Sequence, residues 1–227
     1  MQAQIIELTL LNHLFYFTEV SGGSTSAAIT GNFIGDLALT YAFAKALSEK
    51  EDYYRYLKQP KYEEIRDFGF YCSVARPLHQ NDRTEAYIQN TLFNVDGYVD
   101  ITALEKSGKS PFKNYRQVQG IGIGARFHAL LLSEEKLVLP KVIRVGRALE
   151  TLVRVTPIKL DKKEDIDECW LNAFSLKIVF DNLNAAVALM TEKGKVNFSY
   201  ILENYNLMKQ FTYEEVTTLF EPIFSHG

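Results

Sequence analysis

Positive charge coincides with the apolar alternation of β-strands in the middle of this sequence. Residues 106–159 hold eleven lysines and arginines and three glutamates, a net charge of +8, whereas the whole chain carries −3. Within residues 141–147, alternation places Arg144 and Arg147 on opposite faces of one strand. This pattern predicts a folded sheet that presents cations, rather than a disordered basic tail.

The charge of this basic segment favours a polyanionic partner. Each lysine or arginine that meets a phosphate releases counterions and adds salt-dependent affinity, so we interpret the segment as a nucleic-acid interface. Phe112, Tyr115 and Phe127 supply aromatic rings that can stack on bases. A solvated face of a structural sheet is the alternative, and charge alone does not choose between RNA and DNA. The residues expected to contact nucleic acid are Lys109, Lys113, Tyr115, Arg116, Arg126, Lys141, Arg144, Arg147 and Arg154.

Composition and cysteine content indicate the class and compartment of the protein. Apolar residues make up 47% of the 227 residues, enough for one large domain or two small ones. Cys72 and Cys169 form neither a disulfide framework nor a ligand cluster, which favours a reducing compartment. The first residues lack the pattern of a secretory signal, and no stretch approaches the roughly 18 apolar residues of a membrane span. We therefore expect a cytoplasmic protein without membrane contact.

Hydrophobic periodicity predicts several strands, one early helix and a helical tail. A long first strand is expected over residues 5–17, and a helix over residues 33–49 with Asn32 as its N-cap. The tail is expected to be helical over residues 200–207 and 213–224. Further strands are expected over residues 68–74, 87–95, 98–101, 125–132, 137–145, 149–155 and 176–180.

Two glycine-containing segments are candidates for phosphate sites. Residues 103–110 fit a relaxed phosphate-loop pattern that includes Lys109, but Pro111 follows at once and disfavours the helix that such a loop needs. An NTPase stays an alternative on this pattern. The alternating glycines of residues 120–124 lack the spacing of a dinucleotide site. They indicate either a glycine-rich strand or the close passage of a phosphate backbone.

Catalytic and metal-binding patterns are sparse. His128 with Tyr115 and a lysine would be the candidates for cutting RNA by general acid–base chemistry without a metal. The four histidines of the chain lie far apart in the sequence and have no metal-ligand spacing. We therefore expect no metal and no other cofactor.

Five stretches of the chain carry a resemblance to a known family. They are Gly31-Asn-Phe-Ile-Gly-Asp-Leu-Ala-Leu-Thr-Tyr-Ala42, Asn114-Tyr-Arg-Gln-Val-Gln-Gly120, Phe127-His-Ala-Leu-Leu-Leu132, Leu139-Pro-Lys-Val-Ile-Arg-Val-Gly-Arg147 and Arg154-Val155. The Leu-Pro-x-x-Ile-Arg-x-Gly-basic segment is the most specific of them. From about residue 5 to 160, the chain resembles the type I-D member of CRISPR-associated family five.

The resemblance implies a fold and a place in an assembly. The fold would be α+β, a ferredoxin-like (RNA-recognition-type) antiparallel sheet with an inserted β-hairpin and a C-terminal extension. Residues 1–227 would form one domain, with the core and hairpin in about 1–160 and the extension in about 161–227, outside the similar stretch. Such proteins sit at one end of an RNA-guided surveillance complex and hold the 5′ handle of the guide RNA. They contact the first backbone subunit and the large subunit, near the point where target DNA enters.

The resemblance also implies roles for the basic residues and the absence of catalysis. In type I-D complexes a separate subunit cuts the precursor RNA, so no enzymatic activity is expected here. A metal-independent endoribonuclease that processes the precursor RNA stays the main alternative. Guide phosphates would be contacted by Lys141, Arg144 and Arg147, and the handle or the incoming duplex by Lys109, Lys113 and Arg116.

Overall fold

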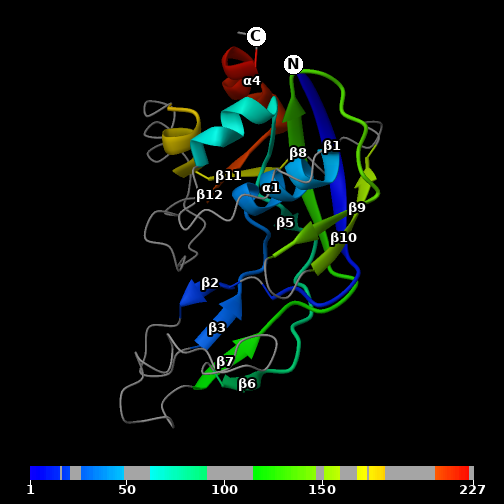
Figure 1. Ribbon diagram of the computed structural model, residues 1–227, viewed down its shortest axis with the longest axis vertical. Helices are drawn as coiled ribbons and strands as arrows, with labels where there is room; N and C mark the ends of the chain where they lie inside the picture. The colour runs from blue at the N-terminus through cyan, green and yellow to red at the C-terminus, as the bar shows by residue number, and fades with distance from the viewer. Residues whose placement is uncertain are drawn as a thin grey trace.

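The computed structural model shows a larger sheet packed with helices and a smaller sheet below it (Figure 1). It describes residues 1–15, 17–20, 27–48, 62–90, 115–146, 151–158, 168–172, 174–181 and 208–224. The described chain crosses between the two sheets several times, so neither sheet is built from one continuous segment. The fold is mixed α/β.

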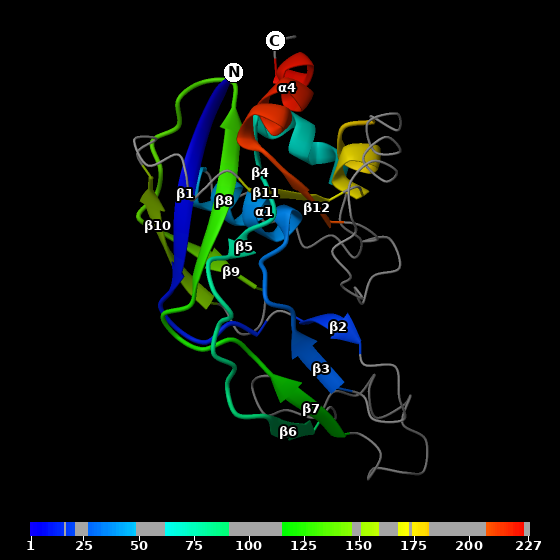
Figure 2. The ribbon, with the colours of Figure 1, turned by 180° about the vertical axis from the view of Figure 1, so that it is seen from behind.

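Six strands form the larger sheet, and all their pairings are antiparallel. Their order is β4-β8-β1-β10-β9, and the short β5 also pairs with β8. The strands are β1 (Gln2–Leu10), β4 (Phe70–Cys72), β5 (Arg76–Pro77), β8 (Arg126–Ser133), β9 (Val142–Val145) and β10 (Thr151–Pro157). The sheet is curled, as the view from behind shows (Figure 2). The first strand of the chain therefore lies at the centre, between strands from the middle of the sequence.

The two faces of strand β1 are buried to different extents. Its apolar residues from Ile6 to Leu10 alternate toward one side, where they share a core with helix α1 (Asp36–Leu47). Ile5 points to the other side and belongs to a second buried cluster. Glu7 lies on the same side as Ile5 but is only partly buried. One face of the sheet is thus core throughout, whereas the other is covered only in part.

The C-terminal elements cover the upper half of this second face. They are β11 (Cys169–Asn172), β12 (Met208–Phe211), which pairs with β11, a π-helical turn (Ser175–Val179) and α4 (Tyr213–Phe224). The ring of Phe220 in α4 stacks on Tyr71 of β4, with ring centroids 5.0 Å apart. Leu130 of β8 lies in the same buried cluster. Aromatic and aliphatic packing therefore joins the last helix to strands from the middle of the chain.

Helix α4 begins with a capping box, which fixes where it starts. The backbone nitrogen of Glu215 donates to Oγ1 of Thr212 at 3.2 Å, and the nitrogen of Thr212 donates to Oε2 of Glu215 at 2.8 Å. Val216 and Phe220 then follow at four-residue spacing and are fully buried. The helix predicted over residues 213–224 is confirmed, whereas residues 200–207, also predicted to be helical, lie outside the described residues.

A buried carboxylate joins α1 to the C-terminal layer. Asp36 accepts hydrogen bonds from the hydroxyl of Tyr71 at 2.7 Å, from the side-chain amide of Asn172 at 3.2 Å and from the hydroxyl of Ser175. Burial raises the pKa of Asp36, and these hydrogen bonds oppose the shift. The carboxyl group therefore links three elements that are far apart in the sequence.

The early helix is confirmed, but it starts later than its apolar spacing predicts. Its N-cap is Gly35 rather than Asn32. Ile34 instead exchanges backbone hydrogen bonds with Ala75, with nitrogen–oxygen distances of 3.1 and 2.9 Å. This tertiary pairing holds the residues before Asp36 in an extended conformation.

Four strands form the smaller sheet, in the order β2-β3-β7-β6. They are β2 (Phe17–Val20), β3 (Ala27–Thr30), β6 (Tyr87–Asn90) and β7 (Tyr115–Gln119), and β3 runs parallel to β7. The chain enters this sheet past a bridge between Leu14 and Ile121. The strand predicted over residues 5–17 is therefore confirmed only as far as Leu10, and its continuation toward residue 17 is wrong. The strand ends at Leu10 because the chain turns there, and the side chain of Asn12 accepts a hydrogen bond from the backbone of β10 at 2.6 Å.

The remaining strand predictions have mixed outcomes. Strands predicted over residues 68–74, 125–132 and 149–155 are confirmed as β4, β8 and β10. The strand predicted over residues 137–145 is confirmed only in its last part, as β9, because residues 137–141 are irregular. The strand predicted over residues 176–180 is wrong, because this short apolar run forms the π-helical turn whose Ser175 binds Asp36. The one predicted from residue 87 is confirmed at its start as β6, while residues 98–101 lie outside the described residues.

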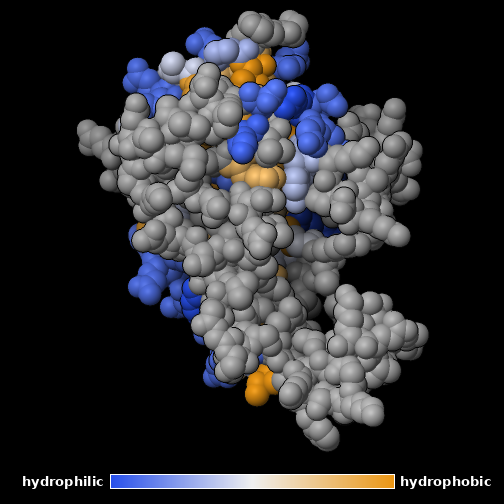
Figure 3. Space-filling view, turned by 90° about the vertical axis from the view of Figure 1, so that its left-hand side faces the viewer, coloured by the Kyte–Doolittle hydropathy of each residue, from blue (hydrophilic) through white to orange (hydrophobic). Residues whose placement is uncertain are grey.

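Within the described part of the chain, no helix is both long enough and apolar enough to cross a membrane. On the side that faces left in Figure 1, the described residues of the upper part are mainly hydrophilic, with small hydrophobic areas between them (Figure 3). Strands β9 and β10 lie on the opposite side, at the right of Figure 1.

Candidate nucleic-acid interface

On the second face of the larger sheet, the lower half is open, because the C-terminal layer ends above it. In β9 and β10, Ile143, Val145 and Val153 turn into the core, and the residues between them turn outward. We term this outward surface the open face; its residues are Glu7, Thr9, Arg126, Val142, Arg144, Leu152 and Arg154. Strand alternation therefore presents Arg144 away from the core, as the sequence predicted.

Strand register brings arginines from distant parts of the sequence into neighbouring rows. Thr9 of β1 pairs with Arg126 of β8 on one side and with Arg154 of β10 on the other. In an adjacent row of the same face, Leu152 of β10 pairs with Arg144 of β9. Since neighbouring strands lie about 4.8 Å apart, the backbones of Arg126 and Arg154 are roughly 10 Å apart. Arginine side chains therefore lie on both sides of the central strand β1.

Arg126 is compensated within the protein. Arg126 of β8 forms a hydrogen-bonded ion pair with Glu7 of β1, and its side chain is 52% exposed. The hydrogen bond from Arg126 holds the pKa of Glu7 below its ordinary value. Arg126 is therefore a weaker attractor for phosphate than its exposure alone suggests.

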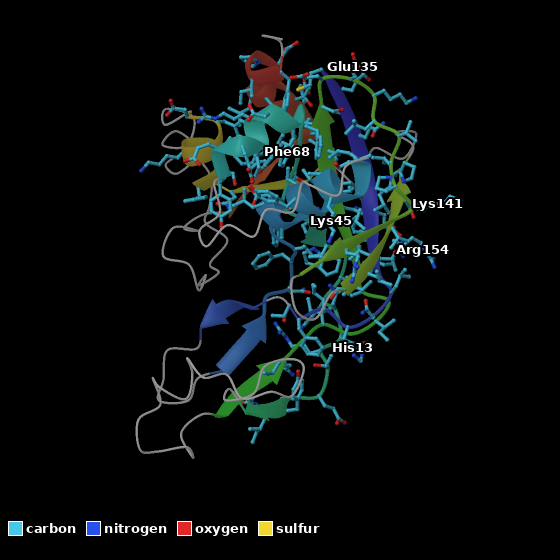
Figure 4. The ribbon with its side chains drawn as sticks, in the orientation of Figure 1. His13, Lys45, Phe68, Glu135, Lys141 and Arg154 are labelled. Carbon is cyan, nitrogen blue, oxygen red and sulfur yellow. The ribbon has the colours of Figure 1, made fainter. Side chains whose placement is uncertain are left out.

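Lys141 and Arg154 extend the positive charge toward the edge of the sheet. Lys141 precedes β9, its side chain is exposed, and its carbonyl oxygen accepts a hydrogen bond from the nitrogen of Val155 at 3.0 Å. Figure 4 shows Lys141 and Arg154 on the same side of the molecule, pointing outward. Arg144 and Arg154 are exposed cations of the open face, and Lys141 adds an exposed cation beside it.

The other candidate residues lie elsewhere. Tyr115 and Arg116 begin β7 of the smaller sheet, where they pair with Asn90 and Gln89 of β6. The structure therefore brings four of the nine candidates to the larger sheet and two to the smaller one. Outside the described residues lie Lys109, Lys113 and Arg147.

One of the aromatic residues expected to stack on bases is not available to them. Phe127 is fully buried, because it alternates into the core next to Arg126. Its predicted stacking role is therefore wrong. Phe112 lies outside the described residues.

The acid–base group proposed for RNA cleavage is not assembled around His128. This residue is 6% exposed and lies in β8, whereas Tyr115 belongs to the smaller sheet. Its Nε2 lies 3.8 Å from Oε2 of Glu7, and its Nδ1 has no hydrogen-bond partner among the described residues. Burial lowers the pKa of His128, and the charge of Arg76 lowers it further. The neutral imidazole is thus favoured at this position.

Metal binding and phosphate-loop chemistry are the other candidates. Side chains of His, Cys, Asp and Glu form no group of three or more that could hold a metal ion there. Residues 103–110, which fit the phosphate-loop pattern, lie outside these regions.

Sequence reasoning missed one cluster of side chains near the open face. His13, Phe15 and Tyr87 make successive edge-to-face ring contacts at the junction of the two sheets. Seventy-two positions separate Phe15 from Tyr87 in the numbering, so no local pattern signals their contact. From the sequence, His13 is expected only as part of a long first strand.

The comparison with solved structures includes a distant likeness. A chain in the structure titled "Cryo-EM structure of the Type III-B Cmr-beta bound to cognate target RNA and AMPPnP, state 1" has 8% sequence identity to this chain. The alignment covers 96% of this chain and 89% of that chain, with a TM-score of 0.42. A likeness this loose says nothing of function. No curated protein matches the sequence.

The comparison with protein families gives a match over nearly the whole sequence. Residues 1–222 match the family described as type I-D CRISPR-associated protein Cas5/Csc1. The match extends past residue 160 through β11, β12 and most of α4. It supports a role as a subunit of a CRISPR effector complex. The chain therefore belongs to the type I-D CRISPR-associated Cas5/Csc1 family.

Proposed function

We propose that the protein is a non-catalytic, cytoplasmic RNA-binding subunit of a type I-D CRISPR interference complex. It would hold the 5′ handle of the guide RNA and help to position target DNA near the large subunit. Its protein neighbours would be the large subunit and the backbone subunits. The observation that carries this proposal is the open face, where Arg144 and Arg154 stand exposed on a sheet in a chain of this family.

The chemistry of the open face suits a ribose-phosphate strand. Arginine presents a planar fork of donors that matches phosphate oxygens. Val142 and Leu152, which are 40% and 41% exposed, lie between the arginines and offer aliphatic surface to the riboses. A rigid sheet also fixes the spacing of these groups before RNA arrives, which lowers the entropic cost of binding.

The order of elements supports a ferredoxin-like core of the RNA-recognition type. When the strands of the smaller sheet and the short intervening elements are set aside, β1, α1, β4 and β8 occur in the order β-α-β-β, and β8 returns beside β1. Strand β10 then pairs with the other side of β1. Where a second helix would stand in the β-α-β-β-α-β order, the described chain contains β9. We propose that this sheet is a variant of that fold.

The proposal includes the absence of catalysis. The burial and lowered pKa of His128 argue against a solvent-facing acid or base at that residue. Incubation of the purified protein with repeat RNA in the absence of metal should leave the RNA intact on a denaturing gel. A discrete cleavage product would replace this part of the proposal with an endoribonuclease.

Salt-dependent RNA binding tests the role of the open face. The double variant Arg144→Ala/Arg154→Ala should bind single-stranded handle RNA more weakly and with a flatter dependence on salt. Because two side chains no longer neutralise phosphates, the slope of log affinity against log salt should fall by about 1.4. Binding is measured by fluorescence anisotropy over a series of potassium chloride concentrations.

A matched control variant removes two positive charges outside the open face. Lys136 and Lys177 are both exposed, and neither belongs to the open face. The variant Lys136→Ala/Lys177→Ala should keep the slope of the unmodified protein. Equal slopes in all three proteins would take Arg144 and Arg154 out of the RNA site.

A further inference from the structure

An exposed aromatic cluster lies at the junction of the two sheets. The ring centroids of His13 and Phe15 are 6.3 Å apart, and those of Phe15 and Tyr87 are 5.9 Å apart, each pair nearly perpendicular. Phe15 is half-buried, whereas His13 is exposed and Tyr87 is 41% exposed. The middle ring is thus anchored, and the two outer rings face solvent.

The absence of a side chain at Gly120 leaves room for the ring of Phe15. A Cβ atom at this position would lie 2.8 Å from Cδ1 and Cε1 of Phe15 and 2.5 Å from the carbonyl oxygen of Leu14. The ring of Phe15 therefore rests on bare backbone. Thr84 fixes this backbone, because its Oγ1 accepts from the nitrogen of Gly120 at 3.0 Å and its own nitrogen donates to the Gly120 oxygen at 3.0 Å.

The cluster is physically continuous with the open face. The hydroxyl of Thr151 donates to the carbonyl oxygen of His13 at 2.9 Å, and the nitrogen of Leu152 donates to Oδ1 of Asn12 at 2.6 Å. Leu152 in turn pairs with Arg144 across β10 and β9. Figure 4 shows His13 below Lys141 and Arg154, close to the smaller sheet. A strand lying over Arg144 would therefore reach the aromatic rings next.

We propose that His13, Phe15 and Tyr87 form a stacking platform for an unpaired base of single-stranded RNA. This inference rests on the proposed function, because the phosphates of that strand would follow the open face at Arg144. Base stacking on an exposed aromatic ring needs no particular base, since every base has a π-face. Tyr87 and His13 contact the base, and Phe15 holds Tyr87 in place.

The surroundings of the platform favour a nucleobase over an apolar protein partner. Among the described residues, the rings have exposed polar neighbours in the sequence, namely Asn12, Asp82, Arg83 and Glu85. Both signs of charge occur among them, and affinity at this point would come from stacking. The cations of the open face would supply the electrostatic part.

Fluorescence of a modified base tests the platform directly. The full-length protein is titrated into single-stranded RNA oligonucleotides that carry 2-aminopurine at one position at a time. At one position, the fluorescence should be quenched on binding. The variant Tyr87→Leu keeps an apolar side chain but no aromatic ring, so it should abolish this quenching and weaken binding on the order of tenfold. Tyr87→Phe should retain both the quenching and the affinity.

Two controls separate this inference from the proposed function. Ile88 is 72% exposed next to Tyr87, but strand alternation turns it to the other face of β6, so Ile88→Ala should bind like the unmodified protein. A duplex of the same RNA sequence offers phosphates but no unpaired base. Its binding should depend on Arg144 and Arg154 and should be unaffected by Tyr87→Leu.

The possible outcomes distinguish the stacking platform from the proposed function. If the protein binds RNA in an Arg144-dependent way but Tyr87→Leu changes neither quenching nor affinity, the platform is overturned and the proposed function stands. If Tyr87→Leu instead weakens only the association with other subunits, the rings form a protein contact, and the inference is wrong. Absence of any RNA binding by the unmodified chain would overturn both.

Discussion

The two halves of one face of the larger sheet differ sharply, although strands β1 and β8 run through both. In β8, Leu130 belongs to the covered half and Arg126 to the open half, and both point to the same side. In β1, Ile5 and Glu7 show the same change. The residue type at alternate positions therefore decides where the C-terminal layer ends. A sheet face can serve as core and as binding surface within two residues of one strand.

Removing an aromatic ring from the covered half should have the largest effect on stability. Phe220→Ala would leave a cavity against Tyr71 and should lower the free energy of unfolding by about 3–5 kcal/mol. Leu152→Ala on the open face should cost less than about 1 kcal/mol. Urea unfolding followed by circular dichroism compares the two variants. Similar losses in the free energy of unfolding would mean that the two halves are equally buried, which would contradict the difference between the covered and open halves.

Removing Asp36 should cost almost as much, because it lies beneath the covered half. Asp36→Ala would leave Tyr71, Asn172 and Ser175 without their common acceptor and should cost roughly 3 kcal/mol. The pKa of Asp36 is raised in the folded state, so its contribution is fully present below the unfolded pKa and declines as pH rises through the folded pKa. The loss measured by urea unfolding should therefore be larger at pH 4.5 than at pH 8. The opposite trend would show that the carboxylate is ionised in the folded protein.

Glu7→Gln should have a smaller effect on stability and a useful effect on binding. The partner Arg126 is half-exposed, so loss of the ion pair should cost only about 0.2–1 kcal/mol at pH 7. The pKa of Glu7 is lowered by Arg126, so the difference is present above the unfolded pKa and disappears as pH falls through the folded pKa. RNA affinity should increase, because Arg126 becomes available to phosphate. Unchanged affinity would restrict the RNA site to β9 and β10.

The smallest stability effect is expected for the exposed arginines. Arg144→Ala/Arg154→Ala should leave the free energy of unfolding within about 0.5 kcal/mol of that of the unmodified protein. The same variant should lose RNA affinity, which separates binding from folding. A thermal scan run beside the anisotropy measurement checks this. A large drop in melting temperature would show that these arginines support the fold.

Local patterns predicted several elements well. The apolar spacing around Val216 and Phe220 indicated helix α4, and alternation around Ile143 indicated the faces of β9. Both signals are periodic and belong to single elements, so they need no tertiary information. The exposure of Arg144 followed from the same alternation.

Long-range contacts account for the errors. The turn after Leu10 depends on Asn12 bonding to β10, and the late start of α1 depends on Ile34 pairing with Ala75. Phe127 is buried because it lies on the same face of β8 as the core residues of that strand. The sequence alone does not show which face of β8 packs into the core. The contact of Phe15 with Tyr87 likewise needs the two sheets to meet. Such pairings are set by packing between distant segments.

The packing of Ile5 in one cluster with Phe220 has a consequence for biosynthesis. At 5–20 residues per second, a ribosome takes about 11–43 s to travel from residue 5 to residue 220. During this interval the nascent chain lacks the helix that covers its first strand. The apolar surface around Ile5 is therefore accessible to chaperones and to non-native partners. A fusion that delays release of α4 should therefore reduce the yield of native protein more than the same fusion at the N-terminus.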